Sequence, residues 1–332
     1  MTDGAPQATL QVDVYLTPED RLAAMREDVR IGLTSTPKEL PPKWFYDERG
    51  SQLFEEITRL PEYYLTDRER VILAEHARDV ALLTAANTLV EPGSGSSEKT
   101  RLLLDAMVEA GHLKRFVPFD VSEQALREAA AAIADEYPGI EVHGVVGDFE
   151  HHLVWLPEGR RRLFAFLGSS IGNLTGEQRA QFLDTLHGLL GTGEALLLGA
   201  DLVKDPAQLE LAYNDSRGIT AEFNRNVLSV INRELGGDFD PGRFTHVARW
   251  DAENEWIEML LRSEVDQRVR VAAVELEVDF AAGEELRTEI SDKFRRSGLE
   301  TELGRAGFEL AHWWEDPDGD FALSLSFSAG SE

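Results

Sequence analysis

The stretch Thr88-Leu-Val-Glu-Pro-Gly-Ser-Gly-Ser-Ser-Glu-Lys99 decides the fold of this chain. An apolar run ends in an acid, turns through two closely spaced glycines and enters a helix that we expect to begin near Ser96 or Ser97. Glycines allow close approach of the backbone to a ligand, and the first turn of a helix offers N–H groups without partners. The stretch is therefore typical of the first strand, turn and helix of a nucleotide-binding α/β sheet, with an ordinary strand–turn–helix corner as the alternative.

The spacing within the turn separates two kinds of nucleotide site. A dinucleotide-binding turn has a small residue three places after its second glycine, and this chain has Glu98 there. An acid two residues before Gly93, followed by Gly-x-Gly, instead favours a class I methyltransferase that binds S-adenosylmethionine. A nicotinamide-dependent oxidoreductase is the weaker alternative.

Strands alternate with helices through the middle of the chain. Apolar runs predict buried parallel strands at 88–91, 116–119, 142–146, 163–167 and 195–198. Helices are predicted between them at 97–110, 122–136 and 175–190, with Ser122 and Thr175 as N-caps. This order predicts an α/β fold, a doubly wound Rossmann-like sheet.

The pattern changes after residue 202. A largely helical segment at 205–234 precedes alternating segments at 244–250, 256–262 and 269–278, which predict an antiparallel meander. A helix at 299–306 and a hairpin at 309–314 and 321–327 then fit the reversed last strand of a methyltransferase sheet. We therefore expect a Rossmann-like methyltransferase domain at 68–202, completed by 294–332. The arm at 20–67, which lacks a strand pattern that matches the sheet, and the insertion at 203–293 would form an α+β substrate-binding lobe.

Composition limits the classes of function. The chain has 332 residues, with 61 acids against 33 bases, a net charge of −28 and no cysteine. This charge disfavours nucleic acid and anionic lipid as partners, and the absence of a signal sequence or long apolar run predicts a cytoplasmic protein. No thiolate site is possible, and the eight histidines lack metal-binding spacing, so we expect no metal. We also expect a monomer.

Polar residues follow the ends of the predicted strands. Asp120, after the second strand, is placed to accept hydrogen bonds from ribose hydroxyls, or else to cap the next helix. Asp148 and Phe149, after the third, could bind the adenine amino group and cover its ring. Lys99 is the cation best placed for the methionyl carboxylate of the cofactor. Their order on successive strands supports a nucleoside site.

The fourth strand leads into the loop Leu167-Gly-Ser-Ser-Ile-Gly-Asn-Leu174. Ligands of open α/β sheets bind beyond the carboxyl ends of the strands, so this loop should border the pocket. Gly168 gives the backbone freedom, and Asn173 offers both a donor and an acceptor, with capping of the next helix as its alternative role.

Two further groups of residues could take part in recognition of a ligand. Tyr46, Phe54 and Tyr63 either pack together or form an aromatic wall around an ammonium group. Glu289 and Ser291, two apart on an extended segment, would face the same way and could receive an imidazole N–H. The alternative for the second pair is a solvated charged strand.

Several longer motifs resemble one family. The chain is similar to the histidine-specific N-alpha-methyltransferases of ergothioneine biosynthesis from about Asp20 to Phe327. The resemblance is carried by PPKWFYDERGSQLFEEITRLPEYY, GSGSSEKTRLLLDAM, FLGSSIGNL, LLLGADLVKD, FNRNVL and VDFAAGEELRTEISDKF. It implies trimethylation of the α-amine of L-histidine to hercynine, with S-adenosylmethionine leaving as S-adenosylhomocysteine.

The resemblance also implies roles for individual residues. The cofactor would be held by Tyr46, Gly93, Lys99, Asp120, Asp148 and Phe149. Histidine would be held at its carboxylate by Asn173 and Tyr213 and at its imidazole by Tyr63, Glu289 and Ser291, with Gly168, Phe54, Thr220 and Met259 lining the rest. Tyr63, Gly168 and Asn173 are the candidate catalytic residues. Pro92 departs from the leucine expected in the family, although a proline before Gly93 need not remove a cofactor bond.

Two other functions stay open from the sequence. One is a methyltransferase of the same fold that acts on another amino acid or a biogenic amine. The other is a nucleotide-binding or histidine-sensing protein without turnover.

Overall fold

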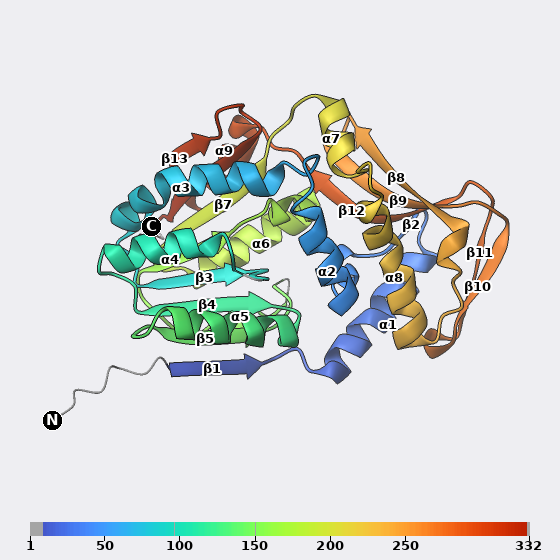
Figure 1. Cartoon of the computed structure of the whole chain (residues 1–332), viewed down its shortest axis with the longest axis horizontal. Coiled ribbons are helices and arrows are strands. Elements are labelled where there is room, and N and C mark those ends of the chain that lie inside the picture. Colours follow the sequence, from blue (N-terminus) through green and yellow to red (C-terminus); the bar gives the residue numbers. More distant parts are fainter. Residues whose placement is uncertain (1–8, 96, 150, 331–332) are drawn as a thin grey trace. The chain divides into compact units, whose positions relative to one another are not determined.

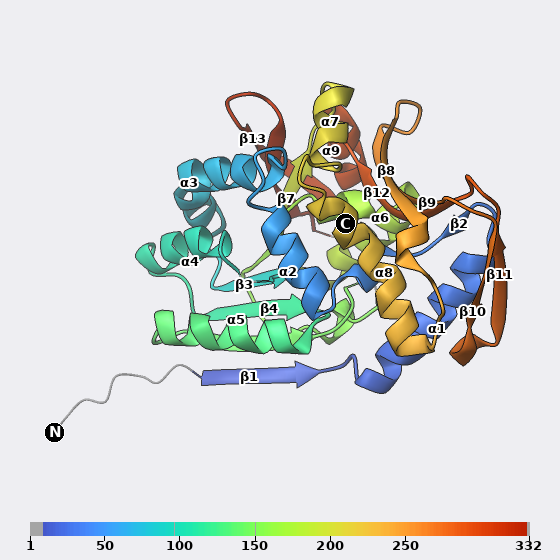
Figure 2. The ribbon, with the colours of Figure 1, turned by 45° about the vertical axis from the view of Figure 1, so that its right-hand side comes forward.

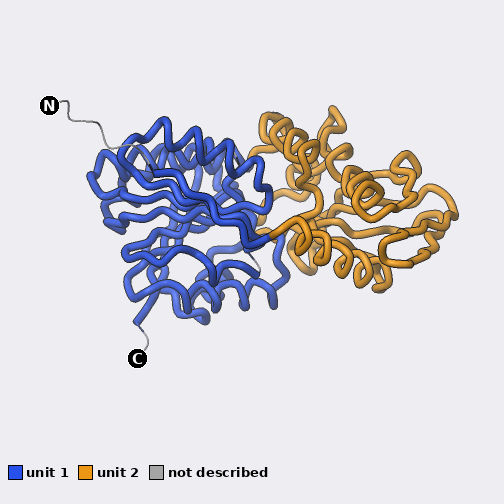
Figure 3. Tube along the Cα trace, turned by 90° about the horizontal axis from the view of Figure 1, so that it is seen from below, with its two compact units in different colours: residues 1–16, 65–202, 294–332 blue, residues 17–64, 203–293 orange. Residues whose placement is uncertain are grey.

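The computed structural model describes residues 9–95, 97–149 and 151–330. The chain divides into two compact units (Figure 3). The first contains the chain up to Leu16, Leu65–Leu202 and the chain from Phe294 on, and the second contains Thr17–Tyr64 and Val203–Lys293. The arm segment of the second unit begins at Thr17 and ends at Tyr64, and its inserted segment runs from Val203 to Lys293.

The first unit is built on a mixed sheet (Figure 1). Within the described residues it has eight strands in the order β1-β5-β4-β3-β6-β7-β14-β13, parallel from β1 to β7 and antiparallel at β14 and β13. The strands are β1 (Thr9–Val14), β3 (Thr88–Pro92), β4 (Arg115–Asp120), β5 (Glu141–Val146), β6 (Arg162–Phe166), β7 (Ala195–Asp201), β13 (Phe308–Glu315) and β14 (Phe321–Ser328). This is a Rossmann-like α/β sheet, and the predicted parallel strands and reversed closing hairpin are confirmed.

Helices flank this sheet: α3 (Leu65–Thr84), α4 (Thr100–Glu109), α5 (Glu123–Glu136), α6 (Gly176–Leu189) and α9 (Arg296–Arg305), with short 3₁₀ turns η2 (Leu153–Trp155) and η3 (Ser170–Asn173). Both predicted N-caps are confirmed, because Ser122 accepts from the N–H of Ala125 and Thr175 forms a capping box with Gln178. Helix α4 begins later than expected, since Ser97 has a left-handed φ of 52°, which an α-helix does not accommodate. Ser96 lies outside the described residues.

Aromatic side chains fill the interior of the first unit. Phe116 and Phe119 lie on β4 and Phe164 and Phe166 on β6, the two strands that flank β3, and all four are at most 1 % exposed. Complete burial of one such side chain contributes roughly 1.5–3 kcal/mol. The apolar runs that predicted the strands therefore also supply the core between sheet and helices.

The segment before the arm contributes a strand that the sequence analysis did not predict. Strand β1 pairs in parallel with β5 at the edge of the sheet, from Thr9 opposite Glu141 to Val14 opposite Val146. Its first three residues are exposed, and polar and apolar residues alternate along it (Thr-Leu-Gln-Val-Asp-Val), so it has no continuous apolar run. Backbone pairing, together with the contact between Asp13 and the His143 imidazole at 2.8 Å, holds it in place. The expectation that the N-terminal chain up to about residue 67 has no strand of this sheet is wrong because of β1, although residues 20–67 themselves contribute none.

The second unit combines helices with two small sheets. Its helices are α1 (Pro18–Thr34), α2 (Glu48–Ile57), α7 (Pro206–Ala212) and α8 (Ile219–Leu235), with 3₁₀ turns η1 (Pro42–Phe45), η4 (Pro241–Arg243) and η5 (Ala272–Val274). One sheet has the order β2-β12-β9-β8, and β10 pairs with β11 in the other. The strands are β2 (Lys38–Glu39), β8 (Phe244–Asp251), β9 (Trp256–Ser263), β10 (Gln267–Val271), β11 (Leu276–Phe280) and β12 (Glu285–Asp292).

Two expected elements of the second unit are each divided. The segment 269–278 is a hairpin of β10 and β11 rather than one strand, because Glu275 adopts a left-handed φ of 51° between them. The helical segment 205–234 is broken between α7 and α8, where Gly218 has a φ of 73°. Helix α8 contacts β8 and β9 as well as α2 (Figure 2).

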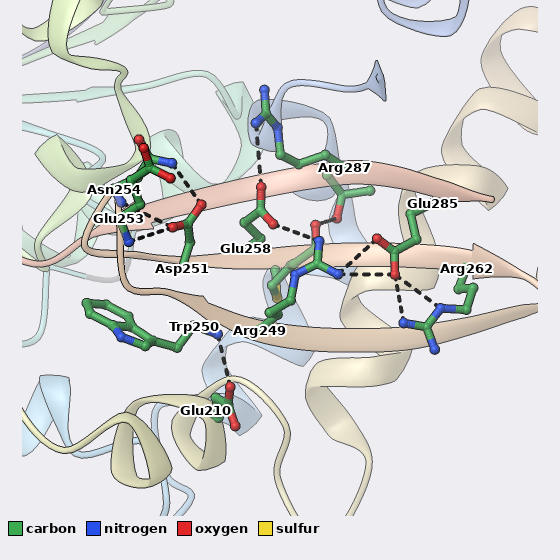
Figure 4. Close-up of polar contacts among 12 residues, drawn as sticks. Glu210, Arg249, Trp250, Asp251, Glu253, Asn254, Glu258, Arg262, Glu285 and Arg287 are labelled. Carbon is green, nitrogen blue, oxygen red and sulfur yellow. Dashed lines mark hydrogen bonds and ion pairs between the residues drawn. The ribbon is translucent and has the colours of Figure 1, made fainter. Parts of the chain in front are cut away.

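The face of the four-stranded sheet away from α8 carries ion pairs (Figure 4). Arg249 bonds Glu258 at 2.9 Å and Glu285 at 3.1 Å, and Arg262 bonds Glu285 at 2.7 Å. These side chains are partly exposed, so the pairs stabilise the sheet only modestly. Among the described residues, no helix combines the length and the apolar character needed to cross a bilayer.

Candidate active site

The turn after β3 leaves open space beside its backbone. Gly93 and Gly95 have left-handed φ angles of 65° and 48°, and a Cβ atom at either would meet nothing within 4 Å beyond its chain neighbours. The N–H of Gly93 donates to the carbonyl of Phe119 at 2.8 Å, which ties the turn to the end of β4. The Ser94 hydroxyl is buried and has no hydrogen-bond partner among the described residues. An orphaned polar atom in an open turn fits a site for a polar ligand.

Asp120, the last residue of β4, bonds to this turn. Its carboxylate accepts the N–H of Gly95 at 3.2 Å and the N–H of Ser122 at 2.9 Å. Burial raises the pKa of Asp120. The N-cap of α5 is Ser122, so Asp120 does not serve as the N-cap of that helix. Its contact with ribose stays a prediction.

Asp148 and Phe149 follow the end of β5. Asp148 is buried and lies 3.4 Å from the Nδ1 atom of His151, measured from a carboxylate oxygen. The Phe149 ring packs edge-on against Phe166 at 5.3 Å and Phe182 at 5.9 Å between centroids. Phe149 is thus anchored to the aromatic core while it stays half-buried.

The loop after β6 begins with two residues in the left-handed region. Gly168 and Ser169 both have left-handed φ angles, of 75° and 59°. The Ser169 hydroxyl accepts the N–H of Asp201 at 3.0 Å, which fixes the loop to the end of β7. Asn173 ends η3, and the cap of α6 is Thr175. The alternative role of Asn173 as that cap is therefore wrong, and its contact with a ligand stays a prediction.

The second unit contains the aromatic group expected from the arm. Tyr46 packs edge-on against Phe54 at 5.6 Å, and Phe54 against Tyr63 at 6.2 Å. Tyr63 in turn lies 6.3 Å from the ring of Tyr213, and Phe223 from α8 contacts both Tyr46 and Phe54. These rings therefore pack together, and their contact with an ammonium group stays a prediction.

A β-bulge orients the polar residues of β12. The register of β12 on β9 shifts between Arg287 and Glu289, so that Thr288 is the extra residue. After the bulge, Glu289 lies opposite Met259 and Ser291 opposite Ile257. Cross-strand partners share a face, so all four lie on the face covered by α8. Without the bulge, Glu289 would share the ion-paired outer face with Arg287.

Thr288 itself joins the bulge to α8. Its hydroxyl lies 2.6 Å from Asn224 Oδ1 and 3.0 Å from the carbonyl of Met259, and it is 1 % exposed. The Asn224 amide also donates to Nδ1 of His246 at 2.8 Å, and Nε2 of His246 donates to the carbonyl of Tyr213 at 2.8 Å. Burial lowers the pKa of His246, which suits this neutral, fully bonded ring.

A buried lysine bonds to two predicted substrate residues. The Lys293 ammonium donates to the Tyr213 hydroxyl at 3.0 Å and to the Ser291 hydroxyl at 2.8 Å, and the two hydroxyls are 2.8 Å apart. Lys293 is 4 % exposed. Thr220, another predicted substrate residue, is also buried, and its N–H donates to Asp215 at 2.7 Å.

The turn between β13 and β14 gathers three carboxylates. Asp316, Asp318 and Asp320 have ligand atoms within 4.8 Å of one another. The Arg68 guanidinium from α3 lies between 2.5 and 3.5 Å from all three. The positive charge of Arg68 offsets the mutual repulsion of the three carboxylates.

Comparison with known proteins assigns the family. Residues 25–327 match the family described as histidine-specific methyltransferase, SAM-dependent. The chain belongs to this family. It is 57% identical over 318 residues to the histidine N-alpha-methyltransferase of Mycolicibacterium smegmatis, covering 96% of this chain and 99% of that protein. It is 58% identical over 303 residues to that of Mycobacterium tuberculosis, covering 91% and 94%.

A more distant relative is fungal. Ergothioneine biosynthesis protein 1 of Neurospora crassa is 38% identical over 241 residues, which cover 69% of this chain and 27% of that longer protein. The chain is thus a methyltransferase enzyme, as predicted. The open turn at Gly93 and Gly95, the orphaned Ser94 hydroxyl and the acids that end β4 and follow β5 fit the S-adenosylmethionine on which this family depends.

This methyltransferase distributes its predicted ligand residues over both units. Gly93, Lys99, Asp120, Asp148, Phe149, Gly168 and Asn173 belong to the first unit, and Tyr46, Phe54, Tyr63, Tyr213, Thr220, Met259, Glu289 and Ser291 to the second. Within the first unit, bonded contacts join the Gly-rich turn to Asp120. Within the second, they join Tyr213 to Ser291.

The sequence analysis missed several residues that contact the predicted ones, among them Glu69, Phe223 and Lys293. Glu69 is fully buried, pairs with Lys99 and accepts the N–H of Gly168 at 2.7 Å. Its helical spacing from Leu65 and Leu73 is a signal that could have found it, because an acid on the buried stripe of a helix needs a partner. Phe223 and Lys293 carried no such signal, since an aromatic in an amphipathic helix and a lysine at the end of a strand are ordinary.

Proposed function

We propose that this methyltransferase transfers three methyl groups from S-adenosylmethionine to the α-amino nitrogen of L-histidine and forms hercynine, the first step of ergothioneine biosynthesis. The observation that carries the proposal is the 57% identity, over 96% of the chain, to a relative named histidine N-alpha-methyltransferase. The order of polar residues on the strand ends and the polar cluster on β12 support it independently.

The first unit would supply the cofactor site. Gly93, Lys99, Asp120, Asp148 and Phe149, with Tyr46 from the second unit, are the residues we assign to S-adenosylmethionine. The cofactor supplies an electrophilic methyl group on a sulfonium. The protein contributes mainly by orientation, since correct positioning of two reactants can lower a barrier by roughly 7–11 kcal/mol.

The second unit would supply most of the histidine site. Glu289 and Ser291 would receive the imidazole together with Tyr63, and Tyr213, with Asn173 of the first unit, would bind the carboxylate. Gly168, Phe54, Thr220 and Met259 would line the remaining space. A site that bonds a substrate N–H discriminates strongly against analogues without it, sometimes by ~10⁴. The aromatic group would tolerate the positive charge of the methylated amine.

The amine must lose its proton before each transfer. A water held by Tyr63 or bulk solvent would accept that proton, and Gly168 and Asn173 would orient the amine. Direct in-line attack then needs space for three methyl groups beside the backbone of Gly168, which has no side chain.

The experiment is a methylation assay with purified protein, read by mass across the amino acids and several biogenic amines. We expect a gain of three methyl groups on histidine alone. Methylation of a different amine would replace the substrate, and binding without turnover would favour a sensor. In the Glu289→Ala variant, histidine affinity should fall by about 10- to 100-fold while S-adenosylhomocysteine affinity is unchanged.

A further inference from the structure

Glu69 contacts two loops that follow the central strands β3 and β6 of the first unit. It lies on α3 with 0 % exposure. One carboxylate oxygen accepts the N–H of Gly168 at 2.7 Å, and the other pairs with the ammonium of Lys99. The Lys99 side chain is 23% exposed, so the ion pair runs from the interior to the surface.

The two loops follow neighbouring strands. Lys99 directly precedes α4, after the turn that follows β3, and Gly168 follows β6, which pairs with β3. Ligands of open α/β sheets bind beyond these carboxyl ends. The Glu69 carboxylate therefore holds the Lys99 ammonium of one loop and the Gly168 N–H of the other, and both loops border the expected ligand crevice.

The sheet leaves room for this carboxylate. Strand β7 has glycine at position 199, and a Cβ atom there would overlap Oε1 of Glu69. An ionised carboxylate is costly to bury unless charge and hydrogen bonds compensate it, and here Lys99 and Gly168 do so.

We propose that Glu69 is a positioning residue for the cofactor. It directs the Lys99 ammonium toward the carboxylate of the methionyl group and fixes the loop at Gly168. This inference rests on the proposed function, because it takes S-adenosylmethionine as the ligand. Glu69 acts through Lys99 and does not contact the cofactor itself.

The test measures binding of S-adenosylhomocysteine to the full chain by calorimetry. Glu69→Gln keeps an acceptor for Gly168 but loses the charge that holds Lys99. We expect this variant and Lys99→Met each to weaken binding by about 10- to 100-fold, the range for hydrogen bonds to charged groups. The double variant should bind no more weakly than Lys99→Met alone, because Glu69 then has no ammonium to direct.

Two controls keep the result interpretable. Glu75→Gln changes an exposed glutamate of the same helix and should leave binding unchanged. Glu69→Asp keeps the charge but shortens the side chain, so it should weaken binding even if Glu69→Gln fails to fold. Thermal unfolding of every variant separates lost affinity from lost structure.

Three outcomes bear on the inference separately from the function. Additive losses in the double variant would make Glu69 a purely structural residue and overturn the inference. Unchanged affinity in folded Glu69→Gln would also overturn it, while wild-type methylation of histidine would leave the proposed function intact. Failure of the wild-type protein to bind S-adenosylhomocysteine would instead overturn the proposed function.

Discussion

The hydroxyl of Thr288 should hold the bulge that orients Glu289. Thr288→Val keeps the shape of the side chain and opens no cavity, but removes the single hydroxyl proton that Asn224 Oδ1 at 2.6 Å and the carbonyl of Met259 at 3.0 Å share. Both acceptors are buried, and leaving such groups with fewer partners costs about 1–3 kcal/mol. We expect the free energy of unfolding to fall by this amount in urea titrations, with an unchanged slope.

The same substitution should also weaken the binding of histidine. A weakened bulge favours the regular register, in which Glu289 would face the ion-paired side of the sheet. Histidine affinity, measured by calorimetry with S-adenosylhomocysteine present, should therefore fall while affinity for S-adenosylhomocysteine alone does not. Thr245→Val on β8 is the matched control, since that threonine is exposed and its loss should change stability by no more than about 0.5 kcal/mol. If Thr288→Val matched this control in stability and in histidine affinity, the reasoning would be refuted.

Three further predictions test other parts of the structure. Gly199→Ala should lower the free energy of unfolding by about 1–3 kcal/mol, because the new methyl group would overlap the Glu69 carboxylate. The control is Gly188→Ala in the last turn of α6, where a methyl group meets nothing within 4 Å, and it should instead raise the free energy of unfolding by up to about 1 kcal/mol. Equal effects of the two substitutions in denaturation would contradict the overlap with Glu69. Burial raises the pKa of Glu91 from 4.5 to about 7, so the native state binds the proton more tightly than the unfolded state. The free energy of unfolding should therefore fall as pH rises from about 4.5 to 7. Thermal melts of Glu91→Gln over this range should lack this dependence of stability on pH. Lys293→Met removes the donor to two buried hydroxyls and should weaken histidine binding by about tenfold or more with S-adenosylhomocysteine affinity intact, whereas equal losses for both ligands in calorimetry would indicate a general structural defect.

Local sequence was sufficient to predict many of the strands, helix starts and turns of the first unit. The apolar runs of β3 to β7 predicted the strands because strands covered on both faces have few polar positions. Ser122 and Thr175 predicted helix starts because their hydroxyls satisfy N–H groups of the first turn. The turn at Gly93 and Gly95 predicted an open ligand site because both residues need left-handed backbone angles.

Other features could not be read from the pattern. Strand β1 has no apolar run, and only its backbone pairing with β5 places it in the sheet. The hairpin of β10 and β11 was hidden because an ordinary glutamate, Glu275, takes the left-handed position of the turn. The alternation of polar and apolar residues in β1 fits a strand but does not specify which sheet it joins, and the residue type of Glu275 gives no sign of the turn.

By itself, the sequence determined the class of fold, the family and the residue types that can bind a nucleoside and a small amino acid, since these follow from periodicity, turn chemistry and motifs along the chain. Only the tertiary structure decided how those residues are oriented. The face on which Glu289 lies depends on a one-residue bulge at Thr288, and the environment of Lys99 depends on a carboxylate from another helix. Such facts depend on register and packing between distant segments, which local residue patterns do not specify.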